Sequence, residues 1–338
     1  MAGNPSKSGF CIFFQPFRSR PETAGFAGFP RPDLRGCPEI GLAQQRSERW
    51  HGWRRIVAAL SDAARERDFP RERESARACA AKVDAAVGWI WSMPLFSQDI
   101  VDFWRFPFAG CDVLHDDDAF LLAINPALDE DERVTVLETT AGKILAAVTP
   151  SLADKAGLDR GQRFSVPVFH QKLDKAGISL HGADYLFYFR ESGRIELALE
   201  SEDVARHLSQ RDEAVFSAFR AAASEQDLDD AFVELDHWAV FGSFQQDRLV
   251  SAASAYPWRA DGRNDARLAD IGVLTLAEFR GRGHARKAVR TLARYIYEQG
   301  YHPQYRCQTD NVASVALARA AGLALFGRWR LISPDCLV

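Results

Sequence analysis

The chain has 338 residues and a formal net charge of −4 at pH 7. This balance gives no overall attraction to nucleic acid, and no apolar run reaches the roughly 18 residues of a membrane-spanning helix, so we expect neither kind of partner. The six cysteines form no Cys-x-x-Cys pair and the eight histidines form no His-x-x-x-His pattern. We therefore predict a cytoplasmic protein with free thiols and no metal site.

The first 92 residues differ in composition from the rest of the chain. Residues 1–92 are rich in Arg, Pro, Gly and Glu and show no sustained hydrophobic period. Such a segment predicts disorder, with a helix allowed over residues 47–87, and its acidic residues argue against a transit peptide. Since Met93 is the only methionine after Met1, residues 1–92 are interpreted as a disordered leader or as the product of a misassigned start.

Residues 93–203 predict a smaller α+β domain. Ser151 is in the right place to begin a helix, and His170 and His181 are expected to be packed or surface histidines rather than ligands. Short strand candidates, separated by Pro, Gly and Asp, cover residues 118–125, 134–138, 143–148, 163–169, 183–189 and 194–199.

Residues 204–338 predict a second domain, built of helices and strands. Its apolar periods indicate two early helical stretches, a hairpin, a buried strand, an amphipathic helix, a further strand and a last helix. In that order they cover residues 204–223 and 228–235, 238–244 with 249–256, 268–276, 283–299, 305–309, and a stretch from Asn311 to Gly322.

A glycine-rich turn joins the buried strand to the amphipathic helix. It reads Arg280-Gly281-Arg282-Gly283-His284-Ala285. Its two glycines allow the backbone N–H groups to point one way, and the following helix adds its positive N-terminal end, so a pyrophosphate fits there. Arg286 stands where a dinucleotide fingerprint needs glycine, and no Gly-Lys-Ser/Thr of a P-loop occurs.

The remaining pattern, Arg-x-x-Gly-x-Ala, resembles the acyl-CoA-binding signature of the GNAT N-acyltransferase superfamily. Asn311-x-x-Ser314 with Gly322-Leu323 resembles a later block of that family, in which Phe is usual at position 323. The resemblance covers roughly residues 205–332 and implies that this domain has a mixed central sheet flanked by helices, within an α+β class. It implies acetyl-CoA or another acyl-CoA as co-substrate, no metal, and transfer to an amine of a small molecule or a protein. It leaves open that residues 93–203 are a degenerate copy of the same fold.

The resemblance also implies which residues bind the co-substrate. Asn311 matches an asparagine that orients substrate or the CoA arm, although an asparagine after a strand is as often an N-cap. For His284, whose position varies in the family, a solvated side chain is favoured over an acid–base role. The complete predicted set is Leu274, Leu276, Arg280, Gly281, Arg282, Gly283, His284, Ala285, Asn311 and Ser314.

Asp270 is the candidate catalytic base, because some family members hold a carboxylate at this place in the strand. The alternative is that Asp270 caps the strand or pairs with Arg267. Ala318 stands where the family's proton-donating tyrosine is usual, which leaves the donor open: water, Ser314 or Tyr256.

Two other functions remain open. Ala318 permits a catalytically silent CoA-binding module. An aminoacyl-transfer enzyme of related fold would need a basic groove that the sequence does not show. A homodimer is compatible with the sequence, which leaves the oligomeric state open.

Overall fold

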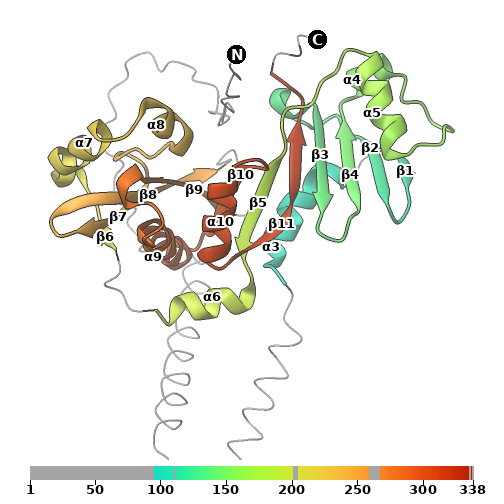
Figure 1. Ribbon diagram of the computed structural model, residues 1–338. Helices are drawn as coiled ribbons and strands as arrows, with labels where there is room; N and C mark the ends of the chain where they lie inside the picture. Colours follow the sequence, from blue (N-terminus) through green and yellow to red (C-terminus); the bar gives the residue numbers. More distant parts are fainter. Residues whose placement is uncertain (1–94, 110–111, 201–204, 259–266, 335, 337–338) are drawn as a thin grey trace, which may run out of the picture. The chain divides into compact units, whose positions relative to one another are not determined.

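Figure 1 shows the computed structural model, which describes residues 95–109, 112–200, 205–258, 267–334 and 336. The predictions for residues 1–92, including the helix over 47–87, lie outside the described residues. By their contacts, the described residues belong to a single compact unit.

Before residue 200 the chain alternates short strands with helices. Two predictions here were wrong, since residues 163–169 and 194–199 were expected to be strands and contribute to helices instead. Phe164, Val166 and Val168 alternate as strand residues do, but Pro167 lies in the first helical turn, where its missing N–H has no intrahelical partner to lose. The elements are α3 (Gln98–Arg105), β1 (Asp112–Asp116), β2 (Phe120–Ile124), β3 (Val134–Thr139), β4 (Ile144–Val148), α4 (Pro150–Ala156), α5 (Val166–Lys175), β5 (Asp184–Phe189) and α6 (Glu191–Ala198).

After residue 204 the predicted hairpin, buried strand, amphipathic helix and following strand and helix are all confirmed. The last strand, β11, was not predicted. The elements are β6 (Arg206–His207), α7 (Glu213–Ala221), α8 (Glu225–Ala231), β7 (Ala239–Gln245), β8 (Arg248–Trp258), β9 (Leu268–Thr275), α9 (His284–Glu298), β10 (His302–Gln308), α10 (Val312–Ala320) and β11 (Leu323–Leu331).

The described strands form one mixed sheet of eleven, in the order β1-β2-β4-β3-β11-β5-β10-β9-β8-β7-β6. This confirms the predicted α+β class with a mixed sheet flanked by helices. Strand β5, from the first predicted domain, lies between β10 and β11 of the second and is antiparallel to both. The predicted boundary between residues 203 and 204 therefore falls within one continuous sheet. That residues 93–203 derive from a second copy of the fold stays a prediction.

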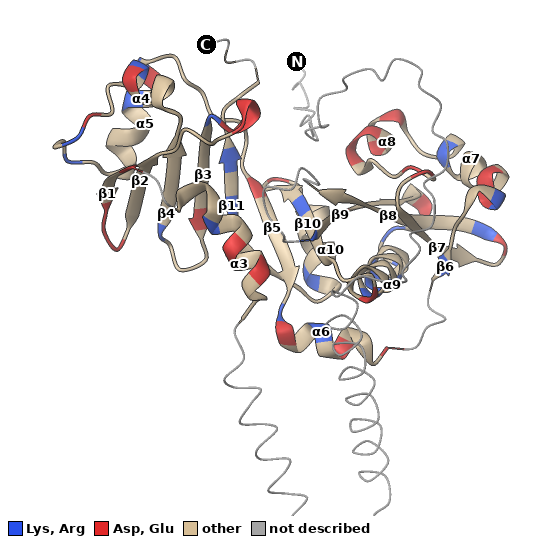
Figure 2. Ribbon diagram, turned by 180° about the vertical axis from the view of Figure 1, so that it is seen from behind, with Lys and Arg blue, Asp and Glu red and all other residues tan. Residues whose placement is uncertain are grey.

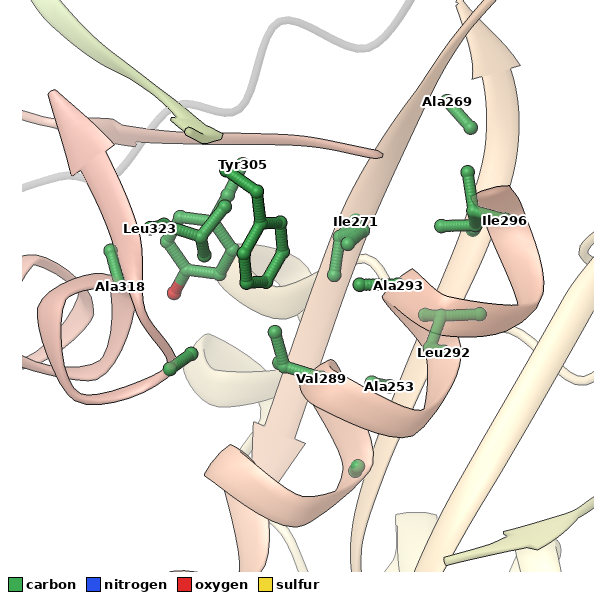
Figure 3. Close-up of a cluster of buried hydrophobic side chains, with 14 of the residues drawn as sticks. Ala253, Ala269, Ile271, Val289, Leu292, Ala293, Ile296, Tyr305, Ala318 and Leu323 are labelled. Carbon is green, nitrogen blue, oxygen red and sulfur yellow. The ribbon is translucent and has the colours of Figure 1, made fainter. Parts of the chain in front are cut away.

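Helices cover both faces of the sheet, and the alternation of residues along β9 tells the faces apart. Ala269 and Ile271 pack against α9, on what we call the α9 face, with the cluster drawn in Figure 3. Leu274 packs with residues of α7 and α8, and Leu268 packs with Trp104 of α3, on the opposite side, which we call the α3–α8 face. The mostly apolar β9 is thus buried from both sides.

Strands β9 and β10 are paired over only part of their length. They run parallel, and their register covers His302 with Leu268 through Gln304 with Asp270. Beyond that point β9 continues to Thr275 on its pairing with β8, and β10 continues to Gln308 on its pairing with β5. The inner edges of residues 271–275 and 305–308 therefore have no strand between them. We call this the β9–β10 opening.

Candidate functional site

The glycine turn has the backbone conformation that the sequence predicted. Gly281 and Gly283 have φ values of +73° and +83°, in the left-handed region that disfavours any residue with a Cβ. A Cβ built on either glycine meets no heavy atom within 4 Å. The turn is therefore constrained by its dihedral angles, not by crowding, and its outer side is open.

The N–H groups of this turn are available to a ligand. Among the turn and loop hydrogen bonds of the described chain, none is donated by the N–H groups of residues 281–285. Helix α9 begins at His284, and its first N–H groups have no intrahelical acceptor. Its 15 aligned peptide units add positive potential at this end. Arg286 and Lys287, exposed in the first turn, add two further charges. These groups fit the diphosphate of a nucleotide-like ligand.

Arg280 is engaged elsewhere than at the turn. Its guanidinium lies 2.6 Å from a carboxylate oxygen of Asp227, in the acidic helix α8 (Figure 2), and its Nε donates to the carbonyl of Thr275 at 3.2 Å. These bonds join α8 to the end of β9. Arg282 lies over the ring of Phe279, with its Cζ 5.3 Å from the ring centroid. The predicted phosphate contact of Arg280 stays a prediction, and it must compete with Asp227.

His284 is held by the sheet instead of being fully solvated. Its Nδ1 lies 2.9 Å from the hydroxyl of Ser243, a buried residue of β7. Partial burial, together with the positive charges of Lys287 and Arg282, lowers the pKa of His284 below its ordinary value. The ring thus favours the neutral form and anchors the start of α9.

Asn311 caps helix α10, as one of its two predicted alternatives had it. Its Oδ1 accepts a hydrogen bond from the Ser314 N–H at 2.9 Å. The Ser314 side chain lowers the pKa of Tyr305 of β10, against the larger rise that burial causes. The side chains of Leu274 and Leu276 are buried with those of α7 and α8, so a ligand would meet only their backbone. Contacts of these four predicted residues with CoA stay predictions.

Asp270 is buried in an ion pair with Arg306 of β10. The Arg306 Nε and Nη2 donate to Oδ2 at 3.0 and 2.5 Å, and Gln304 Nε2 donates to Oδ1 at 2.5 Å. Both carboxylate oxygens therefore already accept hydrogen bonds from side chains of β10. This geometry favours the structural alternative, although the partner is Arg306 rather than Arg267. A catalytic role for Asp270 stays a prediction.

A row of buried polar side chains crosses the sheet at the closed end of the β9–β10 opening. Trp104 Nε1 donates to the Tyr188 hydroxyl at 2.7 Å, and that hydroxyl donates to the Gln304 side-chain carbonyl. Gln304 then donates to Asp270, as described above. The row links α3, β5, β10 and β9, so it holds the strands together where their backbone pairing ends.

Asp184 of β5 was missed by the sequence analysis. It lies opposite Gln308 of β10, on the α3–α8 face that also carries Arg306. Within the described chain its carboxylate has no hydrogen bond or ion pair, because the Arg306 guanidinium binds Asp270. Burial raises the pKa of Asp184, with Arg306 opposing and Asp270 adding to the rise. No local sequence pattern could have marked it, since only the sheet order brings β5 to this place.

The usual tyrosine position is filled by a small buried residue. Ala318 is fully buried in the core of the α9 face. Figure 3 shows the hydroxyl of Tyr305 directed toward α10, near Ala318. Burial raises the pKa of this phenol above its ordinary value. Ser314 of α10 partly opposes this rise.

We also searched the described residues for metal-binding clusters and for membrane-spanning helices. Among them, no group of three or more His, Cys, Asp or Glu side chains is placed to hold a metal ion. No described helix is long and apolar enough to cross a membrane.

Residues 193–324 match the family model described as acetyltransferase (GNAT) domain. No curated protein matches the chain. Similar solved structures include a GNAT-family acetyltransferase from Colwellia psychrerythraea (20% identity, 46% of this chain and 57% of that chain, TM-score 0.35) and a GCN5-related N-acetyltransferase-like protein from Streptococcus suis (16% identity, 49% and 68%, TM-score 0.32). A third is an aminoglycoside N-acetyltransferase in complex with CoA (18% identity, 35% and 89%, TM-score 0.28). The chain thus spans little more than half of the Colwellia protein.

Proposed function

We propose that the protein is an N-acyltransferase, on the premise that residues 193–324 match the model of the GNAT acetyltransferase domain. In this proposal it moves an acyl group, in the simplest case acetyl, from acyl-CoA to an amine of a small molecule or a protein. The amine attacks the thioester directly, without an acylated enzyme intermediate.

The observation that carries the proposal is the unused N–H cradle of residues 281–285 at the start of α9, beside the β9–β10 opening. The cradle suits the pyrophosphate of CoA. From there, the unpaired inner edges of residues 271–275 and 305–308 offer backbone hydrogen-bonding groups to the amide-containing arm of CoA. This path brings a thioester toward the closed end of the opening.

Acyl transfer from a thioester to an amine requires a neutral amine, hydrogen-bond donors for the developing oxyanion, and a proton for the leaving thiolate. Backbone N–H groups on the inner edge of β9 are candidates for the oxyanion donor. The thiolate is a good leaving group near neutral pH, so water can supply its proton and a tyrosine at position 318 is dispensable. The amine approaches from the α3–α8 face, where the polar side chains gather.

Two measurements on the full chain test the proposal. Calorimetric titration with CoA measures binding, and release of free thiol from acetyl-CoA over a panel of amines measures transfer. We expect saturable CoA binding and amine-dependent thiol release. Binding without release for any amine would instead support the catalytically silent CoA-binding module. Absence of CoA binding would contradict both functions.

A further inference from the structure

We propose that His237 is the catalytic base that accepts the proton from the attacking amine, with its ring oriented by Ser254. This inference rests on the proposed function, and it names a residue that the sequence analysis did not single out.

His237 lies on the α3–α8 face, over β8 and next to β9. It follows α8 in the loop that leads into β7, and its Nδ1 lies 2.8 Å from the Ser254 hydroxyl. Ser254 is fully buried on β8, directly opposite Gly272 of β9. Gly272 comes two positions after Asp270, where the pairing of β9 with β10 ends. The imidazole is therefore held beside the segment of β9 that borders the opening.

The loop that carries His237 is packed closely onto the sheet. A Cβ at Gly272 would lie 2.4 Å from the carbonyl oxygen of Ala231 and 2.8 Å from that of Phe232, so only glycine lets the end of α8 come this near to β9. Phe232 itself has a φ of +45°, which is unfavourable for a residue with a bulky side chain. Such strain persists only where the surroundings impose it, and it is common at functional sites.

Two aromatic rings fix the imidazole from its sides. The ring centroid of Phe232 lies 4.9 Å from that of His237, and the centroid of Tyr256 lies 5.1 Å from it. Tyr256 is in turn the direct cross-strand neighbour of Asp270. The imidazole, Tyr256 and the buried ion pair thus follow one another across the α3–α8 face.

The charge state of His237 suits a base. Burial lowers the pKa of His237 below its ordinary value of 6.5, and Asp236 on the same loop only partly opposes this. The ionisable groups on the neighbouring strands are Tyr256 of β8, Asp270 of β9 and Arg306 of β10, and the last two neutralise one another. The ring is therefore neutral at pH 7.

As part of this proposal we assign His237 the neutral tautomer in which Nδ1–H donates to Ser254, which leaves a lone pair on Nε2. No described residue hydrogen-bonds to that nitrogen in the structure. Nε2 is therefore free to accept a proton, whereas both oxygens of Asp270 already accept hydrogen bonds.

Acyl transfer from the thioester to the amine needs only these groups and water. The amine nitrogen forms a bond to the thioester carbon, and the positively charged nitrogen of the resulting adduct gives one proton to His237 Nε2. The carbon–sulfur bond then breaks, the electron pair leaves on sulfur, and the thiolate takes a proton from water. The imidazolium returns its proton to solvent, so the products are the amide and free CoA.

The test uses His237→Asn in the full chain, because asparagine keeps a polar atom near the Nδ1 position and removes Nε2. The acceptor is a hydrazide, because its low pKa keeps it uncharged over the pH range of the kcat/KM profile. Protonation of the acceptor then does not mask the titration of the enzyme. For the wild type, we expect kcat/KM to fall as pH decreases through the pKa of His237, below 6.5. For the variant, we expect kcat/KM at pH 7 to fall by about 10²–10⁴, the acid limb to disappear and the CoA Kd to stay unchanged.

His207→Asn is the matched control, since His207 is an exposed histidine on the edge strand β6, and it should retain the wild-type profile. Should His237→Asn fail to fold, NMR titration of the wild-type His237 ring decides, because its pKa must coincide with the acid limb of kcat/KM. A mismatch, or a folded variant with the wild-type rate and acid limb, overturns the role of His237 while leaving the acyltransferase intact. Wild-type protein that binds CoA but transfers to no amine overturns the proposed function and this inference together.

Discussion

Replacing Gly283 separates the phosphate role of the turn from its structural role. Gly283 has a φ of +83°, and no heavy atom lies within 4 Å of the position that a Cβ would take. Asn and Asp are the residues other than glycine that best tolerate this conformation, and they are nearly equal in size. Gly283→Asn and Gly283→Asp therefore differ mainly by one negative charge.

The expected magnitudes follow from this geometry. Either substitution should cost about 1–2 kcal/mol of stability for the left-handed backbone, with no added steric term because the space is open. The carboxylate adds repulsion toward a phosphate, which at a separation of about 4 Å is worth about 1 kcal/mol in bulk water and about 4 kcal/mol at an effective dielectric constant of 20. The Asp variant should therefore bind CoA about 5-fold to 10³-fold more weakly than the Asn variant.

Calorimetric titration of the two variants with CoA measures this difference, and thermal unfolding checks that they are equally stable. Raising the salt concentration should narrow the gap, because screening weakens an exposed charge–charge repulsion. Arg282→Ala should weaken binding only modestly, since the proposed donors are backbone N–H groups. Equal CoA affinities for Gly283→Asn and Gly283→Asp would refute the phosphate site at this turn.

Three further predictions follow from the described residues and the composition. Asp270→Asn should lower the free energy of unfolding by about 3–5 kcal/mol, because it leaves Arg306 without its buried partner; a stable variant whose turnover drops by about 10²–10⁴ with unchanged CoA Kd would instead make Asp270 the base. Asp184→Asn should raise Tm at pH 7, because the raised pKa of Asp184 means that its contribution to stability is present at low pH and is lost as pH rises through the folded-state pKa. The gain in Tm of Asp184→Asn should shrink as the pH falls toward 3.8. Asp118→Asn, at an exposed position, is the control and should show no gain in Tm. A Tm of Asp184→Asn below that of the wild type at pH 7 would contradict this reasoning. A chain beginning at Met93 should keep the Tm and CoA affinity of the full chain within error, and a large loss of either would contradict the dispensability of residues 1–92.

Local pattern predicted the elements whose period is long and whose boundaries are marked. Helix α9 repeats apolar residues over 15 positions and begins at a glycine turn, and β9 is an almost uninterrupted apolar run. Short segments were ambiguous, because a few alternating apolar residues fit a strand or a brief helix. In α5 the deciding feature was Pro167 in the first turn, and not the alternation around it.

The chemistry of the α3–α8 face could not be predicted in the same way. Asp270 and Arg306 are 36 positions apart, and Trp104 and Tyr188 are 84 apart, so only the tertiary structure makes them partners. The resemblance suggested Asp270 as a base, because some members of the GNAT family hold a carboxylate at this place in the strand. The structure gives a different physical reason for that charge, which is a buried ion pair at the end of strand pairing.

The position of strand β5 in the sheet also depends on pairing between segments that are distant in sequence. The family match begins at residue 193 and leaves β5 out, yet β5 lies between β10 and β11. Strand β10 pairs with β9 only as far as Gln304, so from Tyr305 to Gln308 its strand pairing is with β5. Residues 305–308, which form one side of the β9–β10 opening, are therefore held in the sheet by their pairing with β5. The same strand brings Tyr188 and Asp184 to the α3–α8 face. We infer that β5, from the part of the chain before the family match, helps to form the proposed acyltransferase site.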